Sequence, residues 1–151
     1  MKRIVIFASG SGTNAENIIR FFNQNKTAKV IQVLCNNEHA KVIDRCKLLK
    51  ISCLCFNKND FLKKDTILNL LKETADYIVL AGFLWKIPEN IVAAFPNKII
   101  NIHPALLPKY GGKGMYGINI HRAVKENKET ETGITIHYVN ENYDEGAIIF
   151  Q

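Results

Sequence analysis

Short apolar runs rich in β-branched residues alternate along the chain with longer segments that repeat apolar side chains at helical spacing. The short runs are typical of strands buried on both faces of a sheet, and we expect such strands at residues 3–8, 29–35, 51–56, 76–81 and 98–103. Helices are expected between them, at residues 14–25, 38–50, 60–74 and 88–95. Right-handed crossovers between parallel strands place helices on both faces of the sheet. The order therefore predicts a Rossmann-like open α/β sheet that is mostly parallel.

The C-terminal part of the sequence follows a different pattern. Residues 133–139 alternate strongly and residues 146–151 follow after a polar turn, which predicts an antiparallel hairpin added to the sheet. At 151 residues, with no repeat or linker, the chain is expected to be one domain over residues 1–151. Its last expected strand runs to the final residue, so we expect this domain to lack a C-terminal segment.

Charge and cysteine content limit the classes of partner. The net charge of +6 comes from scattered basic residues, without the basic run or basic-aromatic patch typical of nucleic-acid binding. A mild positive balance suits a phosphorylated or carboxylated small substrate, and it fits an ordinary soluble surface equally well. The four cysteines are interpreted as structural thiols, because the CLC sequence at 53–55 lacks metal-site spacing. The N-terminal apolar stretch is too short for a signal peptide or membrane span, so we expect a cytoplasmic protein.

A glycine-rich turn, FASGSGTNAEN, joins the first expected strand to the first helix. The strand leads directly into Gly10 and Gly12, and the helix is expected to begin near Thr13, with a core-facing stripe that includes Phe21. Free backbone N–H groups and a partial positive charge at a helix N-terminus bind phosphates, so the turn is a candidate anion site. The alternative, compatible with the first, is a plain turn with a capping box between Thr13 and Glu16.

The stretch KIINIHPALLPKYGG places polar side chains at the carboxyl end of the fifth strand. Asn101 and His103 share one face there, and Asp144 lies in the loop between the two hairpin strands. Ligand sites of open parallel sheets lie beyond the carboxyl ends of strands. An amide, an imidazole and a carboxylate can stabilise a developing oxyanion, and these motifs offer no serine or cysteine nucleophile, which favours acyl transfer by direct attack of the acceptor. The alternative is a non-catalytic nucleotide-binding domain in which all three residues are structural.

Four motifs in order carry a family resemblance: SGSGTN at 9–14, VLAGFLWKI at 79–87, NIHPALLP at 101–108 and GITIHYVNENYDEGAII at 133–149. With them the sequence resembles the phosphoribosylglycinamide formyltransferase family over its whole length. The resemblance implies a formyltransferase catalytic domain that transfers a formyl group from the cosubstrate 10-formyltetrahydrofolate to the amine of 5′-phosphoribosylglycinamide, in purine biosynthesis. It implies small-molecule substrates, a tetrahedral intermediate and no metal, nucleic acid or membrane.

The resemblance also implies roles for individual residues. Asn101, His103 and Asp144 are similar to the catalytic residues, and Gly12, Thr13 and Asn14 to the segment that holds the ribonucleotide phosphate. The residues similar to the folate-binding positions are Lys64, Leu84, Trp85, Lys86, Ile87 and Asn101. The alternatives are related enzymes with the same Asn–His–Asp site, namely methionyl-tRNA formyltransferase and formyltetrahydrofolate deformylase.

Overall fold

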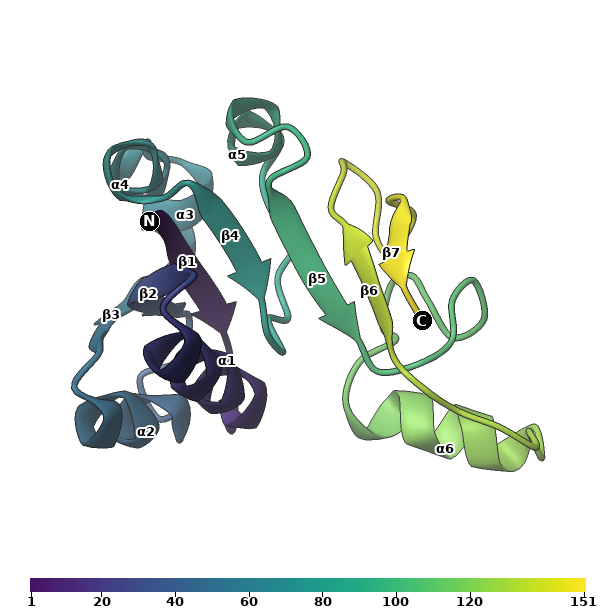
Figure 1. The fold of residues 1–151 in the computed structure, drawn as a ribbon. Coiled ribbons are helices and arrows are strands. Elements are labelled where there is room, and N and C mark those ends of the chain that lie inside the picture. The colour runs from purple at the N-terminus through teal and green to yellow at the C-terminus, as the bar shows by residue number, and fades with distance from the viewer.

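A seven-stranded sheet of order β3-β2-β1-β4-β5-β6-β7 organises the computed structural model, which describes all 151 residues. Five strands pair in parallel: β1 (Lys2–Ala8), β2 (Ala28–Cys35), β3 (Ser52–Cys55), β4 (Tyr77–Leu80) and β5 (Ile99–His103). Figure 1 shows the common direction of β1, β4 and β5. The last two, β6 (Thr135–Tyr138) and β7 (Ile148–Phe150), pair antiparallel. The mostly parallel sheet and its antiparallel hairpin confirm the predicted fold class.

Helices cover both faces of the sheet, and each face has its own apolar core. Side chains alternate along β1, so Val5 and Phe7 lie in one cluster and Ile4 and Ile6 in the other. The helices are α1 (Thr13–Asn25), α2 (Val42–Leu49), α3 (Lys58–Leu62), α4 (Thr66–Thr74), α5 (Glu89–Ala94) and α6 (Ile118–Glu126). The first cluster includes residues of α3, α4 and α5, and the second includes residues of α1 and α2. None of these helices is long and apolar enough to cross a membrane.

Three expectations about the helices are wrong. The single helix expected at 60–74 is two helices, α3 and α4, because Phe61 and Ile67 both enter the same core. In one continuous helix, residues six apart point about 120° away from each other. Phe21, expected to face the core, is 55% exposed. The expected set of helices also lacked α6, although Ile120 is fully buried on one side of it.

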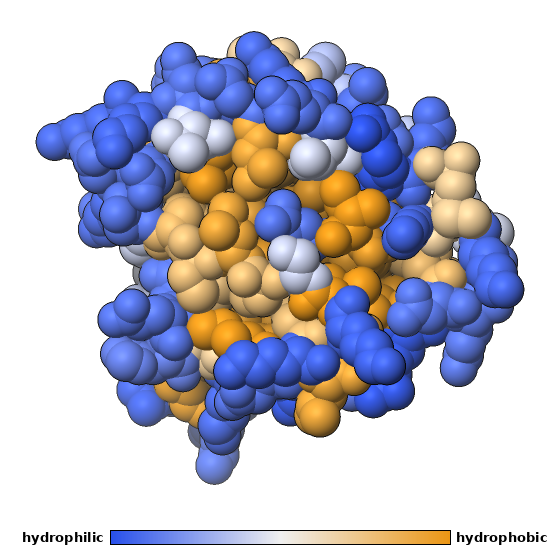
Figure 2. Space-filling view, turned by 90° about the vertical axis from the view of Figure 1, so that its left-hand side faces the viewer, coloured by the Kyte–Doolittle hydropathy of each residue, from blue (hydrophilic) through white to orange (hydrophobic).

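The two outer strands leave apolar side chains exposed. Figure 2 shows the face at the β3 edge, where hydrophobic residues gather in the middle and hydrophilic residues surround them. Leu54 of β3 and Leu48 of α2 are among the exposed apolar residues, and Ile148 and Phe150 of β7 are exposed at the other edge. The polar residues described below lie between these edges, at the carboxyl end of β5.

Candidate active site

The carboxyl end of β5 presents two polar side chains beside strand β6. In the antiparallel pairing of these strands, Asn101 lies opposite His137 and His103 lies opposite Thr135. The Nδ2 atom of Asn101 lies 3.1 Å from Nε2 of His137. Both imidazoles are buried. Strand pairing therefore adds a second histidine to the expected pair of Asn101 and His103.

Asp144 supplies a carboxylate to this group from the loop between β6 and β7. Its Oδ1 lies 3.5 Å from Nδ1 of His103 and 3.5 Å from Nε2 of His137. The amide of Asn101 points at the same oxygen, at 3.5 Å. The second oxygen, Oδ2, accepts a hydrogen bond of 2.9 Å from the backbone N–H of Gly112. The structure thus brings together the three residues that the sequence selected, around a single carboxylate oxygen.

The remaining nitrogen of His103 fixes where its proton lies. Nε2 is 2.8 Å from the carbonyl oxygen of Tyr110, and a carbonyl can only accept, so Nε2 must carry a proton. Nδ1 therefore faces Asp144 with either a lone pair or a second proton. When both nitrogens are protonated, both have an acceptor, so the surroundings of His103 satisfy the cationic imidazole fully.

A cavity of about 360 Å³ opens onto this group. Asn101, His103 and Asp144 form part of its wall together with the loop at 112–117. The other side is formed by residues of the loop that follows β4, which include the predicted folate-contacting residues Leu84, Trp85, Lys86 and Ile87. No serine, threonine or cysteine lines this cavity. The hydroxyl and thiol nucleophiles usual in acyl transfer are therefore missing from its wall.

Lys64 is the one predicted site residue that lines neither this cavity nor the second cavity described below. It follows α3, pairs with Asp60 at 3.2 Å and lines neither cavity. Lys86 instead brings a positive charge to the first cavity, with its ammonium 5.7 Å from the ring centre of Tyr143. Lys58, 5.5 Å from the ring centre of Trp85, lies next to the aromatic cluster behind the cavity. A folate role for Lys64 stays a prediction.

A second cavity, of about 420 Å³, adjoins the first and is lined by the glycine-rich turn at 9–14. The two cavities share wall residues on β5 and the neighbouring loops, namely Gly82, Leu84, Ile102, Pro104 and Gly117. Gly12, Thr13 and Asn14, the predicted phosphate-binding residues, belong to the second cavity. The catalytic candidates and the anion-binding candidate therefore line adjoining cavities.

The capping box between Thr13 and Glu16 is wrong. The residue before α1 is Gly12, with φ of 74°, and no side chain caps this helix. Glu16 is bound instead by Arg20 and Arg45. The backbone N–H groups at the start of α1 consequently donate no hydrogen bond within the protein and stay free for a ligand.

Comparison with known proteins shows to which family the chain belongs. The family model described as "Formyl transferase" matches residues 2–151. The chain belongs to the formyl transferase family. Among its curated relatives, "Phosphoribosylglycinamide formyltransferase" of Bacillus subtilis is 36% identical over 157 residues, which cover 100% of this chain and 78% of that protein. The chloroplastic protein of the same name from Arabidopsis thaliana is 38% identical and is matched over 99% of this chain and 54% of its own length.

Solved structures of similar proteins have the same fold. Glycinamide ribonucleotide transformylase 1 from Geobacillus kaustophilus superposes with a TM-score of 0.87 at 37% identity, covering 100% of this chain and 81% of that chain. The corresponding protein from Symbiobacterium toebii gives a TM-score of 0.89 at 29% identity, covering 100% and 72%. This formyl transferase chain spans about half the length of the plant relatives that it matches.

In the candidate site of this formyl transferase, the pKa values of Asp144 and His137 are both shifted. Burial alone would lower the pKa of His137, but the hydrogen bond and charge of Asp144 and the carbonyl of Tyr138 outweigh it, so the pKa is raised. Burial alone would raise the pKa of Asp144, but His137, the N–H of Gly112 and the nearby charge of His103 outweigh it, so the pKa is lowered. The two effects favour an ionised carboxylate beside a protonated imidazole.

His137 was missed in the sequence, where it stands in GITIHYV as one polar residue of an alternating strand. Its spacing from Thr135 does place both on one face of that strand. The pairing of β6 with β5, which sets His137 opposite Asn101, joins residues 36 apart and cannot be deduced from spacing. One signal in the sequence could have found it: a histidine in an alternating strand next to the loop that carries Asp144.

Proposed function

We propose that residues 1–151 form a catalytic domain that transfers a formyl group from 10-formyltetrahydrofolate to the amine of 5′-phosphoribosylglycinamide. The observation that carries the proposal is that the cavity holding Asn101, His103 and Asp144 adjoins the cavity lined by the glycine-rich turn. One cavity has an aromatic and apolar wall suited to a folate, and the other has free backbone N–H groups suited to a phosphate. The names of the relatives support the same reaction.

Direct attack is the route that the cavity wall favours, because no serine, threonine or cysteine lines it. The neutral amine attacks the formyl carbon, a C–N bond forms, and negative charge develops on the formyl oxygen. The amide of Asn101 and a proton on Nδ1 of His103 both point to one spot, now occupied by Oδ1 of Asp144. An oxygen bound beside that spot would receive both donors, which is how oxyanions are stabilised in acyl transfer.

Proton balance assigns the role of Asp144. The attacking nitrogen must lose one proton, and the departing folate nitrogen must gain one when its bond to the formyl carbon breaks. The carboxylate favours the charged form of His137, and a water bound to it can pass the proton from one nitrogen to the other. The Nε2 of a protonated His137, 3.5 Å from Oδ1, in turn helps to hold Asp144 in place.

Formyl transfer can be measured directly with both substrates. The chain is incubated with 10-formyltetrahydrofolate and 5′-phosphoribosylglycinamide, and formylated ribonucleotide and tetrahydrofolate are expected to form in equal amounts. Release of formate without the ribonucleotide would replace the proposal by hydrolysis of the formylfolate. If the formyl group is transferred neither to the ribonucleotide nor to water, the proposal is refuted.

A further inference from the structure

Helix α2 contacts the glycine-rich turn at three successive residues, although α2 itself lies outside both cavities. The backbone N–H of Val42 donates to the carbonyl of Gly10, at 3.1 Å. Nε of Arg45 donates to the carbonyl of Ser11, at 2.7 Å. Gly12 packs so closely on Val42 that a Cβ atom there would collide with the valine. The turn therefore rests on α2 through two hydrogen bonds and one tight contact.

These contacts determine which way the N–H groups of the turn point. In a trans peptide unit the carbonyl and the following N–H point in opposite directions. Because the carbonyls of Gly10 and Ser11 are held toward α2, the N–H groups of Ser11 and Gly12 point away from it. Neither N–H donates a hydrogen bond within the protein, and both residues line the second cavity. The side of the turn facing away from α2 is thus a set of free donors.

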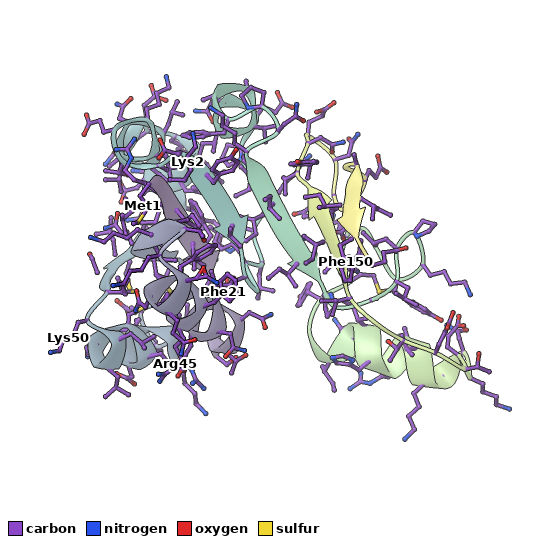
Figure 3. The ribbon with its side chains drawn as sticks, viewed as in Figure 1. Met1, Lys2, Phe21, Arg45, Lys50 and Phe150 are labelled. Carbon is purple, nitrogen blue, oxygen red and sulfur yellow. The ribbon has the colours of Figure 1, made fainter.

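Arg45 is the one side chain of α2 that forms a hydrogen bond with this turn. Figure 3 labels it where α2 meets α1. Besides Ser11, its guanidinium binds Glu16 in the first turn of α1, and Glu16 is bound on its other oxygen by Arg20 at 2.8 Å. Arg45 does not line the second cavity, so it can act there only through the turn. Its planar guanidinium thus connects the carbonyl of Ser11 to the first turn of α1.

We propose that Arg45 is a positioning residue for phosphate recognition: it fixes the Ser11 peptide so that the N–H groups of the turn meet the phosphate of the substrate. The inference rests on the proposed function for the identity of that substrate. A planar guanidinium with several donors can bind the carbonyl and the carboxylate together, whereas a lysine ammonium can replace one of these contacts at a time. Loss of Arg45 is expected to leave the turn in place but free to rotate its peptide.

Steady-state kinetics of variants tests this role. Arg45→Met is expected to raise KM for 5′-phosphoribosylglycinamide about tenfold and to leave kcat and KM for the formylfolate within about twofold, since only ground-state binding of the phosphate is loosened. Arg45→Lys is expected to be intermediate. Arg20→Met is the matched control, because Arg20 binds the same glutamate without touching the turn.

A second measurement separates this inference from the proposed reaction. Inorganic phosphate is titrated into each protein while the amide resonances of Ser11 and Gly12 are followed by NMR. Wild type and Arg20→Met are expected to bind with equal affinity, and Arg45→Met about tenfold more weakly. This result stands even if the ribonucleotide proves not to be the acceptor. Equal affinities and KM values for Arg45→Met and Arg20→Met, or no response of these amides in wild type, would overturn the positioning role.

Discussion

Asp144 carries the charge on which the candidate site depends most, so replacing it by asparagine is an informative perturbation. The two side chains have the same shape, and asparagine can still accept the hydrogen bond from Gly112, so the loop is expected to keep its conformation. What disappears is a negative charge 3.5 Å from each of two imidazoles. At an effective dielectric constant of about 20, one such pair is worth roughly 5 kcal/mol. The 11% exposure of the carboxylate lowers this figure somewhat.

If more than half of that interaction acts on the charged transition state, the barrier rises by about 3–4 kcal/mol. Turnover of Asp144→Asn is then expected to fall about 10²–10³-fold, with the KM values little changed. The assay is single-turnover formyl transfer, accompanied by an NMR titration of the histidine ring protons. Because the hydrogen bond of Asp144 is the largest contribution that raises the pKa of His137, this pKa is expected to fall in the variant. Turnover within about threefold of wild type, with the titration of His137 unmoved, would refute the electrostatic reasoning.

Two further predictions concern stability. Gly12→Ala introduces a Cβ 2.8 Å from the Cα of Val42 at a φ of +74°, and is expected to lower the free energy of unfolding by about 1–3 kcal/mol in urea titrations. Gly10→Ala, with nothing within 4 Å of the new atom, is the control, and equal losses would contradict the packing argument. The raised pKa of His137 stabilises the fold fully below the unfolded value of about 6.5, and this contribution is lost as the pH rises through the folded value. The lowered pKa of Asp144 stabilises the fold above about pH 3.9, and this contribution is lost at lower pH. The urea midpoint of wild type should therefore exceed that of His137→Gln most near pH 5–6 and least above pH 8. A difference in urea midpoints that does not change with pH would count against the interaction of His137 with Asp144.

Periodicity in the sequence was enough to predict the sheet and one half of the site. Side chains alternate along a strand, so Asn101 and His103 were expected to share a face, and the carboxyl end of β5 was the expected place for a ligand. Local pattern could not predict which side chains from other elements join them. The contact of His137 with Asn101 depends on the register of an antiparallel pair, and the contact of Arg45 with Ser11 depends on how α2 packs over the turn.

The helix predictions failed where tertiary packing overrides local pattern. Apolar residues recur through 60–74 as they would in one helix, but the core takes up both Phe61 and Ile67, and the chain breaks between them. Helix α6 was not among the expected helices, although the burial of Ile120 shows that one side of it packs inward. Thr13 and Glu16 have the residue types of a capping box, yet Glu16 is taken by two arginines.

The most direct test of the active site is whether its three side chains work as one unit. Turnover is measured for Asn101→Ala, His103→Ala and Asp144→Asn singly and for the triple variant. Each single change is expected to cost about 10²–10³ in turnover, and the triple variant should lie within about tenfold of the worst single one, because groups that act together are strongly non-additive. Losses that multiply, or a single variant with near-normal turnover, would contradict a shared role in formyl transfer.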